Sequence, residues 1–132
     1  MALILIVDDS STMRKAIAKV VKAEGYNTLE AADGREGLEI AATHAPDCIL
    51  LDLIMPEVDG LEVLKALRER GSKIPVVVLT ADIQEIVRKE CLELGATAFI
   101  NKPLIGNKLL DTIQKALGFK EEVSNEPDTR PN

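Results

Sequence analysis

Five polar side chains that could act on a phosphate group follow short apolar segments of this sequence. Asp8 and Asp9 come directly after the first apolar segment, and Asp52 lies near the end of another. Thr80 and Lys102 follow two further apolar segments. If the fold brings these segments together, three carboxylates, one hydroxyl and one ammonium group would form a single cluster.

Three carboxylates that lie close together need a counter-charge. Two unit charges about 4 Å apart repel by roughly 4 kcal/mol at an effective dielectric constant near 20, and Lys102 alone cannot neutralise three of them. A divalent cation can, and an all-oxygen site that keeps several waters suits Mg²⁺ better than Ca²⁺. The residue types therefore predict that Asp8 and Asp9 hold Mg²⁺ beside Asp52.

Phosphoryl transfer is the chemistry that such a cluster would support. The reaction needs a positioned nucleophile, a metal on the phosphoryl oxygens and donors for the remaining charge. A carboxylate can be the nucleophile and form an aspartyl-phosphate. We expect Asp52 to be that nucleophile, and we expect Lys102 and Thr80 to contact the oxygens of the new phosphoryl group.

Each of these residues also has an ordinary structural explanation. Asp9 or Ser10 could cap the helix that follows them. Thr80 could cap a later helix, and Lys102 could belong to a surface ion pair. Asp52 is harder to explain in this way, because an unpaired buried carboxylate costs several kcal/mol. The ordinary explanations together require four independent coincidences.

The elements that must position these residues are strands and helices in alternation. Five apolar segments are predicted strands: Leu3–Val7, Tyr26–Ala31, Cys48–Leu53, Ile74–Leu79 and Ala96–Ile100. Three of them are almost continuously apolar, which is typical of strands covered on both faces. Between the strands, apolar residues recur at helical spacing. The predicted inward faces are Met13, Ile17, Val20 and Val21; Leu38, Ala41 and Ala42; Leu61, Leu64 and Leu67; Ile83, Val87 and Cys91; and Ile105, Leu109, Ile113 and Leu117.

This alternation predicts an α/β protein with a doubly wound parallel sheet and right-handed crossovers. For five strands the common order is 2-1-3-4-5, the flavodoxin-like arrangement. Ligands of such sheets bind outside the carboxyl ends of the strands, where the strand order reverses. The rule brings the polar residues to one edge: Asp8, Asp9, Asp52, Thr80 and Lys102.

Length and composition predict one domain and a short tail. The chain has 132 residues, of which 46% are hydrophobic and 29% charged, as in an ordinary globular domain. We assign residues 1–118 to the domain. Residues 119–132 end in the polar sequence KEEVSNEPDTRPN, which contains two prolines and predicts a disordered tail.

Charge and composition argue against several other functions. The net charge is −6, so the chain lacks the positive charge that binds a phosphate backbone. Aromatic residues make up 2% of the chain, which leaves few side chains on which bases could stack. We therefore expect no DNA partner. Cys48 and Cys91 lie within apolar stretches, which favours buried free thiols in a reducing compartment. The first apolar segment is too short for a signal peptide, and no segment is long enough to cross a membrane. We therefore expect a cytoplasmic protein without membrane insertion.

Four segments resemble the receiver domain of two-component response regulators, especially the single-domain chemotaxis (CheY-like) type. They are VDDSSTMRK (7–15), LLDLIMPEVDGLEVL (50–64), VVLTAD (77–82) and GATAFINKP (95–103). The resemblance implies that Asp52 accepts a phosphoryl group from the phosphohistidine of a sensor histidine kinase. It also implies a magnesium site with four ligands: Asp8, Asp9, Asp52 and the backbone carbonyl of Ile54.

The resemblance further implies a switch. Thr80 would move to contact the phosphoryl group, and Phe99 would rotate into the vacated space, although Phe99 could also be an ordinary core aromatic. Lys102 would pair with the phosphoryl group, and its peptide bond to Pro103 would be cis. The family often has Tyr at the position of Phe99, so a hydroxyl contact with a partner is one that this chain cannot make.

A second departure from the family concerns the lifetime of the phosphoryl group. Ile54 and Asp82 occupy positions that flank the route of the attacking water in the family. An isoleucine cannot orient water by hydrogen bonding, so we predict slow dephosphorylation, unless Asp82 compensates.

We expect a signalling module that acts in trans, through contacts with a downstream protein. That protein could be a flagellar motor switch component or a phosphorelay protein, or the chain could be a phosphate sink for its kinase. A phosphatase with turnover would need a second acid after the nucleophile, where Ile54 and Met55 stand. A flavin carrier would need a Ser/Thr/Gly-rich loop and aromatic residues to stack the ring. We therefore expect no enzyme with independent turnover.

Overall fold

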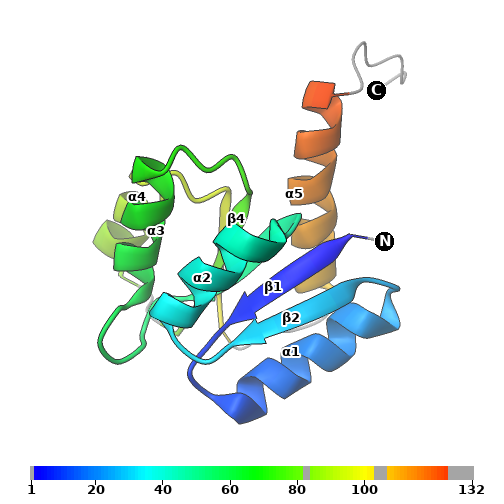
Figure 1. Ribbon diagram of the computed structural model, residues 1–132, viewed down its shortest axis with the longest axis horizontal. Coiled ribbons are helices and arrows are strands. Elements are labelled where there is room, and N and C mark those ends of the chain that lie inside the picture. Colours follow the sequence, from blue (N-terminus) through cyan, green and yellow to red (C-terminus); the bar gives the residue numbers. More distant parts are fainter. Residues whose placement is uncertain (1, 82–83, 103–106, 125–132) are drawn as a thin grey trace.

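The computed structural model describes residues 2–81, 84–102 and 107–124, and strands and helices alternate along them (Figure 1). The strands are β1 (Leu3–Val7), β2 (Asn27–Ala31), β3 (Cys48–Asp52), β4 (Val76–Thr80) and β5 (Ala98–Asn101). The helices are α1 (Ser11–Ala23), α2 (Gly34–His44), α3 (Gly60–Glu69), α4 (Glu85–Glu93) and α5 (Lys108–Ser124). Each predicted strand is present, and its ends are shifted by no more than two residues.

All five strands are parallel and follow the order β2-β1-β3-β4-β5, which confirms the predicted doubly wound sheet. Strand β1 lies between β2 and β3, so Val7 pairs with Ala31 on one side and with Leu51 on the other. The order reverses at this point. The chain leaves β1 and β3 at the same edge of the sheet, and the residues that follow these strands become neighbours.

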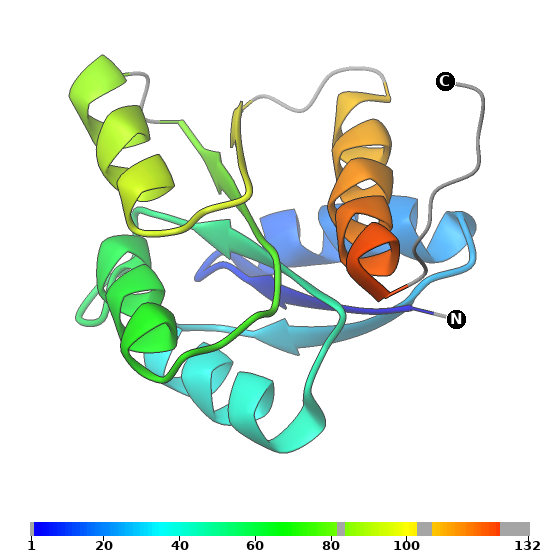
Figure 2. The ribbon, with the colours of Figure 1, turned by 90° about the horizontal axis from the view of Figure 1, so that it is seen from above.

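Successive residues of the strands face opposite sides of the sheet and build two cores. On one side, Leu5 and Val7 pack in a cluster with buried residues of α2, α3 and α4. On the other side, Ile4 and Ile6 pack with buried residues of α1 and α5. Figure 2 shows the same two layers, with α1 and α5 on one face of the sheet and the other three helices across it. This double coverage is the reason that the strands are continuously apolar.

Two of the predicted inward-facing residues lie on the surface instead. Val20 is 44% exposed, because the buried side of α1 is centred on Ile17, Ala18 and Val21 and a step of about 100° per residue carries Val20 past its edge. Ala42 is exposed as well, since α2 turns Ala41 toward the sheet. Both predictions were wrong for the same reason: periodicity gives the width of an apolar stripe and leaves its orientation uncertain by about one residue.

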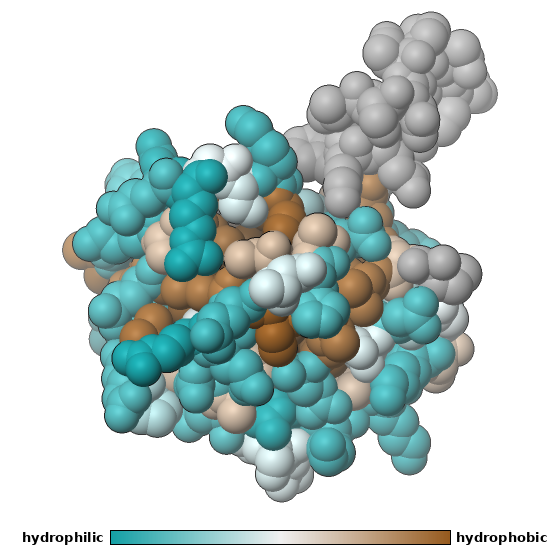
Figure 3. Space-filling view, in the orientation of Figure 1, coloured by the Kyte–Doolittle hydropathy of each residue, from teal (hydrophilic) through white to brown (hydrophobic). Residues whose placement is uncertain are grey.

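Polar residues cover most of the surface. On the face seen in Figure 3, hydrophilic residues surround a central group of hydrophobic ones. Cys48 and Cys91 are buried and form no disulfide within the described residues, as the sequence predicts. None of the helices in the described part of the chain is long and apolar enough to cross a membrane.

The last helix continues beyond the predicted end of the domain. Helix α5 ends at Ser124, so the first residues of the predicted tail are helical. The Lys and Glu residues of this segment are good helix formers. A polar composition alone therefore does not show where a helix ends. The domain boundary at residue 118 stays a prediction. Other expectations concern residues outside the described ranges: Asp82, Ile83, Pro103, Ile105 and residues 125–132.

Candidate functional site

The first two acids of the site lie in the turn between β1 and α1. The Asp8 side chain is 3% exposed, its backbone N–H donates to the carbonyl of Ala31, and its Oδ1 accepts from the backbone N–H of Ser10 at 2.8 Å. Ser10 is the N-cap of α1 and accepts from the backbone N–H of Met13. The helix cap is therefore Ser10, and the exposed Asp9 remains free for another role.

The third acid, Asp52, is the last residue of β3. It is buried, and its Oδ1 accepts from the backbone N–H of Ile54 at 3.3 Å. Helix α3 begins against this strand end: the N–H of Gly60 donates to the carbonyl of Leu53 at 3.0 Å. A Cβ atom on Gly60 would lie only 2.5 Å from the carbonyl oxygen of Asp52. The close approach requires glycine, and it fixes the backbone that carries the Asp52 carboxylate.

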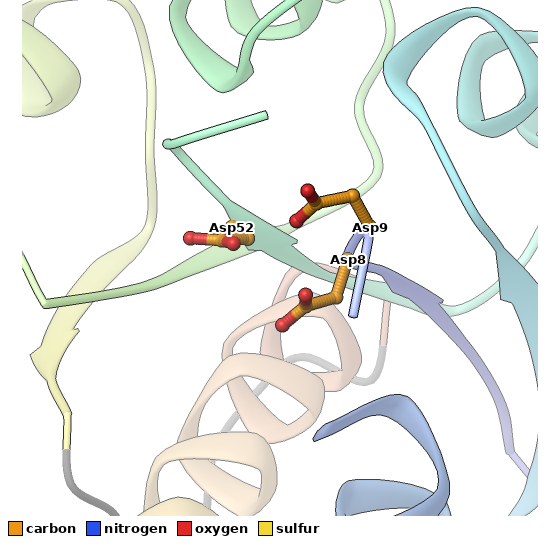
Figure 4. Close-up of side chains that lie close together, drawn as sticks. All are labelled: Asp8, Asp9 and Asp52. Atoms are coloured by element: carbon orange, nitrogen blue, oxygen red, sulfur yellow. The ribbon is translucent and has the colours of Figure 1, made fainter. Parts of the chain in front are cut away.

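The structure brings the three predicted acids together. One carboxylate oxygen from each of Asp8, Asp9 and Asp52 lies within 4.8 Å of the others. Figure 4 shows these carboxyl groups gathered beyond the ends of the two strands that carry them. Three carboxylates are hard oxygen donors of the type that Mg²⁺ binds, with water completing its shell. This donor set therefore fits the ion.

Lys102 lies at the same edge and pairs with two of the acids. Its Nζ is 3.1 Å from Asp8 Oδ2 and 3.8 Å from Asp52 Oδ2. The backbone N–H of Lys102 donates to the carbonyl of Thr80 at 2.8 Å, so the end of β5 is tied to the end of β4. One ammonium group against three carboxylates leaves excess negative charge at the site.

Burial and the neighbouring charges both act on the carboxyl group of Asp52. Burial of its carboxyl group raises the pKa of Asp52 above its usual value, and the charges of Asp8 and Asp9 act in the same direction. The ammonium of Lys102 and the N–H of Ile54 oppose them but do not cancel the shift. A divalent cation would stabilise the ionised form of Asp52, which is the nucleophilic form.

The predicted switch residues lie on β4 and β5, and Thr80 is the one that lies near Asp52. Thr80 is fully buried at the end of β4, one residue after Leu79, which pairs with Asp52 across the ladder. Thr80 does not cap α4, because that helix begins at Glu85 and has Gln84 at its N-cap. Phe99 is half-buried on β5 and packs against the core formed with α2, α3 and α4.

Sequence reasoning missed three residues that shape this site. Gly60 supports the backbone of Asp52, as described above. Arg14 donates to the backbone carbonyl of Asp8 at 2.6 Å, and Glu30 of β2 accepts from Arg14 at 3.2 Å. One sequence signal could have pointed to Arg14: a basic pair, Arg14 and Lys15, stands near the start of a helix that has no acid in its first turn. Helix dipoles disfavour cations there.

Curated relatives resemble this chain over most of its length. The chain is 38% identical over 114 residues to the response regulator MprA of Mycolicibacterium vanbaalenii, but it spans only 49% of that protein. It thus spans about half the length of the MprA relatives. It is also 37% identical to the sporulation initiation phosphotransferase F of Bacillus subtilis, over 89% of this chain and 94% of that one.

Solved structures agree with this similarity. A chain in the crystal structure of the CheX–CheY–BeF₃–Mg²⁺ complex from Borrelia burgdorferi is 34% identical, with a TM-score of 0.82. The match covers 86% of this chain and 87% of that one. The response regulator receiver domain family matches this chain over residues 4–114, a range that contains every acid of the site. The chain therefore belongs to the response regulator receiver domain family, whose domains are signalling phosphoacceptors and not enzymes with substrate turnover.

Proposed function

We propose that Asp52 accepts a phosphoryl group from the phosphohistidine of a sensor histidine kinase, with Mg²⁺ held by the acidic cluster. Receiver domains work with histidine kinases as a family. The observation that carries the proposal for this residue is the position of its carboxylate, which is buried within reach of Asp8, Asp9 and Lys102. The magnesium ion present in the related CheY complex supports the choice of metal.

The residues of the site divide the reaction between them. An oxygen of Asp52 attacks phosphorus and the P–N bond to the kinase histidine breaks; the histidine ring, protonated on its other nitrogen, leaves as neutral imidazole with the electron pair of that bond. Lys102 exchanges its contact with Asp8 for one with a phosphoryl oxygen. Bound Mg²⁺ supplies charge neutralisation, held by Asp8, Asp9, Asp52 and the backbone carbonyl of Ile54.

The signal would then leave the site along β4 and β5. In the proposed switch, the hydroxyl of Thr80 moves to the new phosphoryl group and Phe99 turns into the space that Thr80 leaves. The fully buried position of Thr80 and the half-buried position of Phe99 support this coupling. The changed surface would contact a downstream protein. We expect this to occur in the cytoplasm, and the buried thiols of Cys48 and Cys91, which are not in a disulfide, agree with a reducing compartment.

We propose two alternative downstream roles for the phosphorylated protein. The first is chemotaxis, with a motor switch protein as the partner, and the likeness to the CheY chain supports it. The second is a phosphorelay, in which Asp52 passes its phosphoryl group to a histidine of another protein. The match to 94% of the length of a sporulation phosphotransferase supports this output.

The phosphoacceptor proposal is tested with acetyl phosphate and beryllofluoride. Wild type should gain one phosphoryl group in the presence of Mg²⁺, as measured by intact mass, and Asp52→Asn should gain none. Asp9→Asn keeps the acceptor but lacks one metal ligand, so it should need more Mg²⁺ for the same yield. Modification of Asp52→Asn to the level of wild type would disprove the role of Asp52.

A transfer assay separates the two outputs. The labelled phosphoprotein is mixed with a histidine phosphotransfer protein and, separately, with a motor switch protein of the same organism. Movement of the label to histidine supports the relay. Binding of the motor protein that depends on beryllofluoride, without movement of the label, supports chemotaxis.

A further inference from the structure

Arg14 contacts the backbone of the site, and none of the roles above uses this contact. Its Nη1 donates to the carbonyl oxygen of Asp8 at 2.6 Å, and its Nε donates to Glu30 Oε1 at 3.2 Å. The Arg14 side chain is only 14% exposed. The guanidinium group therefore connects β2 to the end of β1, where two of the three acids leave the sheet.

The Asp8 carbonyl is a point from which the position of Asp9 can be controlled. This carbonyl and the N–H of Asp9 belong to one planar peptide unit. Because Arg14 holds the oxygen of that unit, it also fixes the direction in which the chain continues to the Cα atom of Asp9. The Asp8 side chain is held separately, by the N–H of Ser10 and by Lys102. Asp9, in contrast, is exposed, so its placement depends more on the backbone.

Electrostatics alone does not explain a cation at this place. Arg14 lies in α1 near the positive end of the helix dipole, and its charge would repel a metal ion bound to the adjacent acids. Glu30 offsets that charge, since it pairs with Arg14 at 3.2 Å and with Lys15 at 3.6 Å. The planar fork of an arginine can bond to a carboxylate and a carbonyl at once, which a lysine does poorly.

We propose that Arg14 is a positioning residue for the magnesium site, anchored by Glu30. It holds the Asp8–Asp9 peptide so that the Asp9 carboxylate faces Asp52. Loss of this hold should weaken Mg²⁺ binding even though a repelling charge is removed. The inference rests on the proposed function only in requiring that Mg²⁺ binds to these three acids.

The test measures Mg²⁺ binding by calorimetry on the full-length chain, with MgCl₂ as the titrant. Arg14→Gln should raise the Kd about tenfold, at the lower end of the effect of losing a partner that orients a metal ligand. Its yield of beryllofluoride adduct at saturating Mg²⁺ should equal that of wild type. Arg14→Lys keeps the charge and should raise the Kd by a smaller factor.

Lys15→Gln is the matched control. It removes the same charge and a contact with the same Glu30 carboxylate, but Lys15 is 73% exposed, and among the described residues it forms an ion pair with Glu30 only. Its Kd should stay the same or fall. An unchanged or lower Kd in Arg14→Gln would overturn the inference, and so would equal weakening in Lys15→Gln.

Two further outcomes keep the result interpretable. If Arg14→Gln does not fold, as judged by circular dichroism without metal, Arg14→Lys decides: a Kd equal to that of wild type overturns the inference. If wild type itself binds no Mg²⁺ and forms no adduct, the proposed function fails, and the inference fails with it. Failure of the inference alone is recognised by normal binding in both wild type and Arg14→Gln.

Discussion

Lys102 Nζ lies 3.1 Å from a carboxylate oxygen of Asp8, although the two residues are 94 positions apart in the sequence. The Lys102 side chain is 15% exposed and that of Asp8 is 3% exposed, so the pair is largely shielded from water. In the absence of metal, Lys102 is the cation that stabilises this part of the acidic cluster. In the proposed mechanism, the same ammonium group changes partners when Asp52 is phosphorylated.

Replacing Lys102 with Met should destabilise the metal-free protein by about 3 kcal/mol, because a buried charge loses its partner. Mg²⁺ should bind this variant more tightly than wild type, since the repulsion from the ammonium group is gone. Urea unfolding with and without Mg²⁺ measures both effects. In wild type, Mg²⁺ at a hundred times its Kd should add about 2.7 kcal/mol. Lys19→Met, at an exposed position of α1, is the control; equal stabilities of the two variants without metal would contradict the prediction.

Asp52→Asn should stabilise the metal-free protein at neutral pH. Burial raises the pKa of Asp52 in the folded state, so the folded chain binds this proton more tightly than the unfolded chain does. The ionisation of Asp52 therefore removes stability from wild type as the pH rises from the ordinary pKa of an aspartate through the raised one. Denaturant unfolding in EDTA, from acidic to neutral pH, should show the advantage of the variant growing over this window and vanishing below it. If the difference in unfolding free energy between Asp52→Asn and wild type became smaller as the pH rises, the pKa of Asp52 would be lowered on folding and the prediction would be wrong.

Gly60→Ala should destabilise the protein by about 1–3 kcal/mol, the usual effect of overpacking. The new methyl group would lie 2.5 Å from the carbonyl oxygen of Asp52 and 2.6 Å from the Cα atom of Leu53, and backbone atoms cannot yield cheaply. Gly118→Ala is the matched control: nothing lies within 4 Å of its Cβ position in α5, and alanine should stabilise a helix there by about 0.5–1 kcal/mol. Thermal unfolding distinguishes the two, and similar melting temperatures would refute the close-approach argument.

Ile54→Asn should shorten the lifetime of the phosphorylated state. The Ile54 side chain is 61% exposed, and the backbone N–H of Ile54 donates to Asp52 Oδ1 at 3.3 Å, so this residue stands beside the acceptor without a side-chain group that could orient water. An amide could, and we expect dephosphorylation to accelerate about tenfold, less than the roughly 10²–10⁴ of a full general base. Loss of radioactive phosphate in Mg²⁺ buffer gives the rate. The control is Leu92→Asn, at another exposed apolar position; an unchanged rate in Ile54→Asn would end the hypothesis.

The fold was predictable because its signals are local and repeated. Strands buried on both faces need apolar residues at nearly every position, and helices between them need a stripe at their own period. Polar residues at the ends of such strands must lie at one edge of the sheet. This rule predicts from the sequence alone that Asp8, Asp9, Asp52 and Lys102 lie close together.

The remaining features depend on direction, which a sequence pattern does not carry. Val20 and Val21 are neighbours of the same type, and only the orientation of α1 decides that the second is buried. Arg14 could have pointed to solvent as Lys15 does; its contact with the Asp8 carbonyl needs the exact path of the turn. The role of Gly60 follows from the close approach of its backbone to that of Asp52 and Leu53. The sequence shows only that a short loop separates these residues.

The contact between Lys102 and Asp8 also joins the two parts of the chain that are furthest apart in the order of synthesis among the site residues. The acids leave β1 and β3, while the ammonium group that balances them follows β5, the last strand to be synthesised. A nascent or clipped polypeptide that lacks this strand carries Asp52 without its balancing charge. The full set of charges around Asp52 is therefore assembled only when β5 has joined the sheet beside β4.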